Sequence, residues 1–156
     1  MSTKFTHKNI PMVDSQSLKL LQSTVKLNDV ITKTISSHLL EKGYTSITPS
    51  LLSFLSILEC GVNYGSEIAR KLDVSRQMVA KTVKALCALG YLEQKSGIGK
   101  QKEIHFTEKG ERLISDARQM LSDIDSLILN HLNIMQPQYI IQDLTVIAEA
   151  IDQHTP

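Results

Sequence analysis

Long apolar runs are absent from this 156-residue sequence, and no stretch approaches the roughly 20 apolar residues that a membrane-spanning helix needs. The N-terminal segment, MSTKFTHKNIPMVDS, is polar and lacks the apolar core of a secretory signal. The two cysteines, Cys60 and Cys87, have neither CxxC spacing nor a nearby histidine, which excludes a disulfide framework and a zinc knuckle. We therefore expect a cytoplasmic protein with no membrane partner.

Patterns that carry catalysis or hold a cofactor are missing as well. The stretch SGIGK contains a lone GxGK, but it has no strand-loop-helix context and no following serine or threonine, so it is not a phosphate loop. No Ser-His-Asp, paired-carboxylate or Cys-His constellation stands out, and the five histidines have no metal-ligand spacing. The sequence predicts a protein that is not an enzyme, with no catalytic residue, no cofactor and no metal.

Positive charge is concentrated in one short segment. Residues 66–102 carry 8 Lys and Arg against 3 Asp and Glu, whereas residues 103–156 carry 3 against 9 and residues 1–65 carry 6 against 4. A basic segment in an otherwise near-neutral or acidic chain is typical of a surface that faces phosphates. The alternative is a solvated helix face that is rich in lysine.

Helical periodicity predicts a mainly α-helical fold outside this segment. An apolar pattern runs over residues 14–42 and stops at Gly43, where a left-handed backbone suits glycine. A second helix is expected over residues 47–61, with Thr48 as its N-cap and Gly61 as its end. Two further helices with apolar residues at 3–4 spacing follow, one capped by Thr107 and the other beginning after the break at Pro137.

Residues 66–106 predict a helix, a tight turn, a second helix and a two-stranded hairpin. A short helix capped by Ser66 leads to Asp73, which tolerates a left-handed turn, and LDVSRQMVAKTVKALCALGYL then supplies the second helix with Ser75 as N-cap. After Gly90 the pattern alternates, so YLEQK and EIHF are expected to pair as strands joined by SGIGKQK. This order is that of a helix-turn-helix followed by a small β-wing.

The second helix has an apolar face and a basic face, and in a helix-turn-helix its N-terminal side chains enter the major groove of DNA. Arg76 suits bidentate reading of guanine, and Gln77 suits adenine or a phosphate, although both are ordinary residues for an exposed first turn. The lysines are expected at phosphates, and those of the wing at the minor groove or its phosphates unless the tip is only a solvated loop. The candidate DNA-contacting residues are Ser75, Arg76, Gln77, Lys81, Lys84, Lys100 and Lys102.

The stretch GSEIARKLDVSRQMVAKTVKALCALGYLEQK, followed by IHFTEKGERL, resembles the winged helix-turn-helix of the MarR family of bacterial transcription regulators. The most specific pieces are LDVSRQMVAKTVKALCALGYL and FTEKG, and the order of the flanking helices extends the resemblance to nearly the whole chain from about Asp14. The resemblance implies a homodimer that binds a pseudo-palindromic operator in double-stranded DNA and that a small ligand or an oxidant frequently releases. The family wing usually carries an Asp-x-Arg tip, whereas this chain has SGIGKQK, in which Lys100 or Lys102 would act as a point charge without the planar fork of arginine.

The resemblance also implies a ligand pocket between the dimer helices and the winged module. The corresponding residues, which read equally well as core, are Ile35, His38, Leu39, Leu55 and Leu58. A redox sensor is less expected, because a reactive thiolate needs a cation nearby and the sequence has none next to Cys60. Cys60 lies at a helix end and is the candidate for an exposed thiol, whereas Cys87 is expected to pack within its helix.

The helices that flank the winged module carry apolar faces too wide for isolated surface helices. An isologous two-fold dimer would bury these faces, and the alternative is a monomeric all-α domain with a thick core. We therefore expect a flexible N-terminal arm over residues 1–13, a helical dimerisation region over 14–46 and 107–156, and a winged helix-turn-helix DNA-binding domain over 47–106.

With the resemblance, these patterns predict a sequence-specific, dimeric DNA-binding transcription regulator. A repressor that a small-molecule ligand releases is favoured, because a protein bound over a promoter blocks polymerase sterically. The alternative is a winged-helix protein-interaction module whose basic face meets an acidic partner without sequence-specific DNA binding. The salt dependence of binding separates the two, since phosphate neutralisation gives a steep loss of affinity with salt.

Overall fold

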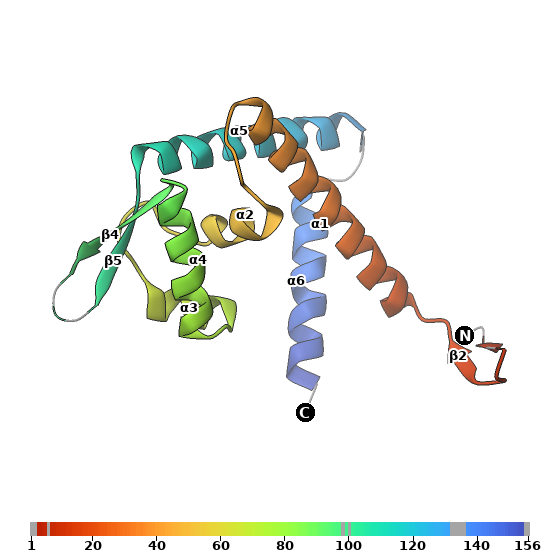
Figure 1. Ribbon diagram of the computed structural model, residues 1–156. Helices are drawn as coiled ribbons and strands as arrows, with labels where there is room; N and C mark the ends of the chain where they lie inside the picture. Colours follow the sequence, from red (N-terminus) through yellow and green to blue (C-terminus); the bar gives the residue numbers. More distant parts are fainter. Residues whose placement is uncertain (1–2, 6, 98, 100, 132–136, 155–156) are drawn as a thin grey trace. The chain divides into compact units, whose positions relative to one another are not determined.

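The computed structural model describes residues 3–5, 7–97, 99, 101–131 and 137–154 (Figure 1). Within these residues the chain forms two compact units that divide between Glu59 and Cys60. Both units are mainly helical, and each holds its own small antiparallel β-element. None of the helices in the described part of the chain is long and apolar enough to cross a membrane.

The first unit consists of a short hairpin and two helices. The hairpin strands are β1 (Thr3–Phe5) and β2 (Pro11–Val13), and the helices are α1 (Gln16–Glu41) and α2 (Pro49–Ser56). Ser15 and Thr48 cap the two helices, because their hydroxyl oxygens accept hydrogen bonds from backbone N–H groups in the first turn at 3.1 and 3.3 Å. Gly43 follows α1 with a φ of +91°, which confirms the left-handed helix end expected there.

The first unit differs from the sequence-based expectation at two places. Within the stretch where a flexible arm was expected, strands β1 and β2 pair antiparallel, and Asn9 between them takes a φ of +59° (Figure 1). Helix α2 does not extend to Gly61; it stops at Ser56, and the N–H of Leu58 donates to the carbonyl of Leu55 in a final tight turn. Asparagine tolerates a left-handed turn without glycine, so the sequence carries no Gly-based turn signal at this hairpin.

The second unit contains all the elements expected of a helix-turn-helix with a wing, and one more strand. Its elements are β3 (Asn63–Tyr64), α3 (Gly65–Leu72), α4 (Arg76–Ala88), β4 (Leu92–Ser96), β5 (Lys102–Phe106), α5 (Glu108–His131) and α6 (Pro137–His154). The three strands form one antiparallel sheet in the order β3-β5-β4. The unexpected strand β3 pairs Asn63 with Ile104, and it leads straight into α3, so Tyr64 and not Ser66 is the N-cap of that helix.

The core of the second unit lies where α3, α4 and the sheet meet. Val79, Val83 and Leu86 on one face of α4 are buried, as are Ile68 and Ala69 on α3, as the helical spacing predicts. Tyr91, which precedes β4, is fully buried, and Leu92 and Ile104 on the strands are nearly so. Asp73 joins α3 to α4 in the left-handed conformation with a φ of +51°, which confirms the tight turn predicted from its sequence position.

A small group of contacts joins the N-terminal end of helix α5 to the C-terminal end of α4. The hydroxyl of Thr107 donates to the carbonyl of Gly90 at 2.6 Å and accepts from the N–H of Gly110 at 3.0 Å. The ammonium group of Lys109 donates to the carbonyl of Leu89 at 2.9 Å and lies 4.4 Å from the centre of the Tyr91 ring. These contacts explain why α5 belongs to the same unit as α4, although a boundary at 106/107 was expected from the sequence.

Candidate nucleic-acid interface

Helix α4 starts sharply because Ser75 caps it. The Oγ of Ser75 accepts a hydrogen bond from the N–H of Met78 at 3.1 Å, while its own backbone is extended. The cap leaves the next two residues, Arg76 and Gln77, exposed in the first turn. Two candidate base-reading side chains therefore stand at the N-terminal end of a helix whose opposite face is buried.

The exposed face of α4 is basic. Lys81 and Lys84 are exposed along with Arg76, and the helix contains no Asp or Glu. Among the described residues, none forms an ion pair with any of these three cations. Three unneutralised positive charges on one exposed helix are suited to an anionic partner such as a phosphate backbone.

Met78 is a feature of this surface that sequence reasoning missed. Its side chain is 57% exposed in the first turn of α4. A large apolar side chain next to Arg76 and Gln77 can contact a thymine methyl group, the one apolar feature of the major groove edge. The helical spacing alone gave no signal for this, because position 78 lies at the boundary between the two faces.

On the wing, in contrast to α4, acidic side chains lie next to basic ones. Glu93 pairs with Lys95 at 2.8 Å on β4, and His105 lies 2.9 Å from Glu103 on β5. The hydrogen bond from Lys95 lowers the pKa of Glu93, so this pair stays ionised. Lys102 is exposed at the start of β5, opposite Ser96, and the other wing lysine named above, Lys100, lies outside the described residues.

A cavity of about 430 Å³ brings part of the candidate surface together. Arg76 of α4 and Lys102 of β5 both line it, so two residues far apart in the sequence share one site. Gln94 and Gln101 add amide groups from the wing, and neither was predicted, because only the pairing of β4 with β5 brings them near α4. The remaining lining residues come from β3, the start of α3, α4 and β5: Tyr64, Gly65, Ser66, Val79, Ala80, Val83 and Ile104.

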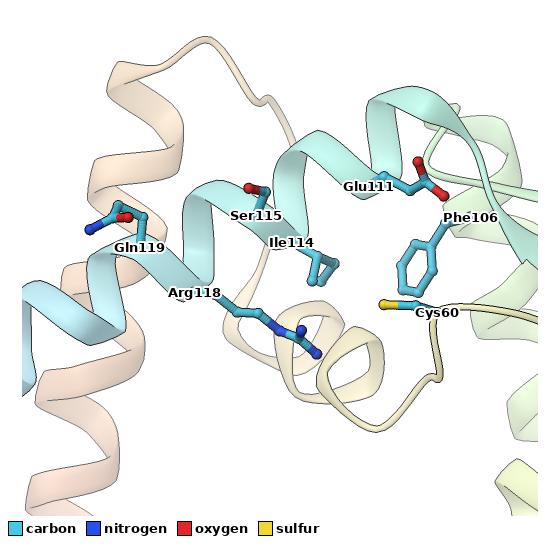
Figure 2. Close-up of a pocket in the computed structure, with 7 residues that line it drawn as sticks. All are labelled: Cys60, Phe106, Glu111, Ile114, Ser115, Arg118 and Gln119. Atoms are coloured by element: carbon cyan, nitrogen blue, oxygen red, sulfur yellow. The ribbon is translucent and has the colours of Figure 1, made fainter.

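A second cavity, of about 410 Å³, lies along α5 (Figure 2). Cys60 and Phe106 line it together with side chains from the first three turns of α5. It combines apolar surface, from Phe106 and Ile114, with one cation, Arg118. The other lining residues are Glu111, Ser115 and Gln119.

The residues predicted for a ligand pocket lie elsewhere, in the first unit. Ile35, Leu39, Leu55 and Leu58 are buried, and His38 is half-buried. None of the five lines either of the two cavities described above. Their burial agrees with the alternative interpretation, in which these residues belong to the core.

The two cysteines differ in environment. Cys60 is exposed and lines the cavity along α5, whereas Cys87 is half-buried on α4. Burial raises the pKa of the Cys87 thiol, and the nearby Glu93 carboxylate raises it further, which disfavours a reactive thiolate. In the described part of the chain no three His, Cys, Asp or Glu side chains gather to hold a metal ion.

The order of α3, the tight turn, α4 and the β4–β5 hairpin, with β3 on the same sheet, defines the winged helix-turn-helix fold. No family model matches the sequence, and no curated protein matches it either. Solved structures do match, and the likeness extends beyond the winged module to the flanking helices, because about nine-tenths of the chain is covered.

The matching structures include several MarR-family regulators. Staphylococcus aureus MarR in complex with salicylate and kanamycin is 17% identical, with a TM-score of 0.69 over 89% of this chain and 94% of that chain. A MarR transcriptional regulator from Methanosarcina mazei Go1 is also 17% identical, with a TM-score of 0.70 over 90% of this chain and all of the other. The Mycobacterium tuberculosis transcriptional regulator MOSR in complex with DNA is 13% identical, with a TM-score of 0.62 over 90% and 98%. The chain thus has the fold of these regulators.

Proposed function

We propose that this protein is a sequence-specific, homodimeric DNA-binding transcription regulator. The observation that carries the proposal is the exposed face of α4, where Arg76, Lys81 and Lys84 stand with no acidic neighbour on the helix. In the helix-turn-helix this is the surface that enters the major groove. A solved protein of the same fold, the regulator MOSR, is in complex with DNA, which supports the same use of the fold here.

Within this proposal the candidate residues have different roles. Arg76 and Gln77 read base edges from the first turn of α4, and Met78 adds apolar contact. Lys81 and Lys84, farther along the helix, neutralise phosphates, as Lys102 does from the wing. Ser75 keeps its hydroxyl hydrogen for a base or phosphate, because its oxygen acts only as the acceptor in the cap. Lys100 has the same proposed role as Lys102.

A homodimer is supported by apolar side chains that are left exposed on three helices. On α1 they include Leu21 and Val25, on α5 Leu127, and on α6 Ile141 and Ile151. Exposed apolar surface of this extent marks an interaction site, and two-fold symmetry is the commonest way in which one chain covers such a surface with its own copy. A dimer also suits a pseudo-palindromic site, because it supplies one α4 per half-site.

Selection of bound sequences from a pool of random duplexes tests this function, followed by titration of the enriched duplex across salt concentrations. We expect a palindrome with half-sites about one helical turn apart and a steep, linear fall of log affinity with log salt. Failure to enrich any sequence would contradict the proposal. A shallow salt dependence with retained binding to acidic proteins would instead favour the protein-interaction module.

We further propose that the protein acts as a repressor and that a small ligand releases it from DNA. The cavity along α5 is the candidate site for such a ligand, since Phe106 and Ile114 offer apolar contact and Arg118 offers a cation for a carboxylate. Salicylate, an aromatic acid, is present in the solved Staphylococcus aureus MarR complex and is therefore a reasonable probe. The buried residues Ile35, Leu39, Leu55 and Leu58, with His38, remain the alternative site.

Displacement of labelled operator by salicylate tests the ligand proposal. We expect salicylate to release the wild-type protein and to be at least about tenfold weaker against Arg118→Ala, because the variant lacks the partner of the carboxylate. Arg112→Ala is the matched control, since Arg112 is exposed on the same helix but does not line the cavity. Equal sensitivity of both variants would exclude Arg118 as the anchor.

A further inference from the structure

Two opposite charges line the cavity of about 410 Å³ along α5. The side chains of Arg118 and Glu111 both belong to its lining (Figure 2). Within the part of the chain that the structure describes, neither of them forms an ion pair. A cation and an anion in one cavity are therefore both available to a ligand.

Helical spacing explains why these two charges do not pair with each other. Residues three or four positions apart on a helix can form ion pairs, as Glu108 and Arg112 do on the same helix. Glu111 and Arg118 are seven positions apart. Their α-carbons are thus separated by about 10 Å along the helix axis, although two full turns bring both side chains to the same face. Neither has an oppositely charged residue three or four positions away.

Apolar side chains lie between the two charges. Ile114 is on the same face of α5, one turn after Glu111 and one turn before Arg118, and Phe106 contributes from the end of β5. In the view of Figure 2, Ile114 and Phe106 lie between the guanidinium of Arg118 and the carboxylate of Glu111. The order along the cavity is therefore a cation, an apolar wall and an anion.

This order discriminates between classes of ligand. A ligand with a carboxylate as its only charge, such as salicylate, finds a partner in Arg118 but places a second negative charge in the cavity that Glu111 lines. A ligand that also carries an ammonium group replaces this repulsion with a second attraction. Specificity of this kind combines a favourable contact with the right ligand and an unfavourable one with the wrong ligand.

We propose that the cavity along α5 takes a zwitterionic ligand, with a carboxylate and an ammonium group at the two ends of an apolar body. This inference rests on the proposed function and names the class of ligand that occupies the site proposed there. Arg118 binds the carboxylate, Glu111 binds the ammonium group, and Ile114 and Phe106 contact the body of the ligand. An ω-amino acid and a short apolar peptide share this chemistry.

Titration calorimetry of the full chain without DNA gives the first test. We expect wild type to bind 6-aminohexanoate at least about tenfold more tightly than hexanoate or hexylamine, which each carry one of the two charges. Glu111→Gln should bind 6-aminohexanoate and hexanoate about equally. Asp125→Asn is the matched control and should keep the preference, since Asp125 is exposed on the same helix but does not line the cavity.

Three results would overturn the proposal: no binding of any probe, equal affinities of the three probes for wild type, or a preference for 6-aminohexanoate that survives in Glu111→Gln. A parallel titration with trialanine distinguishes the two sources of the ligand. Tighter binding of trialanine than of 6-aminohexanoate identifies a peptide, and the reverse order identifies an ω-amino acid.

Charge reversal gives a second test that loss of folding cannot imitate. Glu111→Lys places a cation at each end of the cavity, so the variant should bind hexanedioate, which has two carboxylates, about tenfold more tightly than wild type does. The same variant should lose affinity for 6-aminohexanoate. A Glu111→Lys protein that gains no affinity for hexanedioate would contradict the role of position 111.

Calorimetry without DNA separates the ligand class from the proposed function. A chain that enriches an operator but binds the three probes alike retains the function and loses only the ligand class. A chain that prefers 6-aminohexanoate but enriches no DNA sequence retains the ligand class and loses the function. Operator binding that 6-aminohexanoate leaves unchanged removes release by the ligand and leaves both the site and the DNA reading in place.

Discussion

Gly110 faces the carbonyl group of Tyr91 so closely that a Cβ at position 110 would lie 2.0 Å from the carbonyl oxygen and 3.0 Å from the carbonyl carbon. Gly110 stands in the first turn of α5, and Tyr91 precedes β4. Because Gly110 has no side chain, the first turn of α5 can pack against the backbone of the segment that follows α4. The same oxygen accepts a hydrogen bond from the N–H of Thr107 at 3.1 Å, which secures the approach.

We expect Gly110→Ala to lower the free energy of unfolding by about 1–3 kcal/mol, because backbone atoms must move apart to admit the methyl group. Urea denaturation followed by circular dichroism measures this change. Gly61→Ala is the control, since a Cβ at Gly61 meets no atom within 4 Å. A Gly110→Ala protein as stable as Gly61→Ala would contradict the close approach.

Two substitutions of Ser75 distinguish its role as a helix cap from its role on the candidate DNA surface. Ser75→Ala should cost about 0.5–2 kcal/mol of stability, because the N–H of Met78 loses its partner. Ser75→Asp should keep the stability, since aspartate is an equally good N-cap, but it should weaken DNA binding through its negative charge. Thermal unfolding and operator titration on the same samples measure both effects, and unchanged DNA affinity of Ser75→Asp would remove Ser75 from the interface.

Arg76 and Lys81 should behave differently when each is replaced by alanine. Arg76→Ala should weaken binding to the selected operator by about 1–3 kcal/mol and relax the preference at one base pair. Lys81→Ala should weaken binding to all duplexes alike and reduce the salt slope by about one. Lys33, exposed on α1, gives the control substitution, and an Arg76→Ala protein with full affinity and preference would refute the base-reading role.

The thiols of Cys60 and Cys87 should react at different rates with a disulfide reagent near neutral pH. Cys60 is exposed, whereas burial and the Glu93 carboxylate raise the pKa of Cys87, so Cys87 carries less thiolate. We expect Cys60→Ser to remove the fast phase and to leave a slow phase that accelerates as the pH rises toward the elevated pKa. A fast phase that survives in Cys60→Ser would assign the reactive thiol to Cys87.

Much of the fold was predictable because its signals are local. The caps at Ser75 and Thr107 and the left-handed positions at Asp73 and Gly43 each depend on one side chain and its immediate neighbours. Strand β3 was not predictable, because a strand of two residues is too short to show alternating apolar and polar positions. It exists only because it pairs with β5. Ser66 was misassigned as a cap for the same reason.

The residues of the candidate surface were predictable on α4 and at Lys102, but their arrangement around one cavity was not. The exposure of Arg76, Lys81 and Lys84 follows from the helical position of the buried stripe. That Arg76 shares a cavity with Gln94 and Lys102 depends on contacts between segments far apart in the sequence, which no local pattern contains. The cavity along α5 was missed likewise, since it joins Cys60 to Arg118.

The base of the wing is held independently of its tip. Ser96 pairs with Lys102, the N–H of Gly97 donates to the carbonyl of Gln101 at 3.2 Å, and β3 secures the far side of β5. We expect a tip on such a support to tolerate replacement. The wing of this chain is therefore a natural place for protein engineering, where an arginine-bearing tip could be grafted to add minor-groove reading without redesign of the helices beneath it.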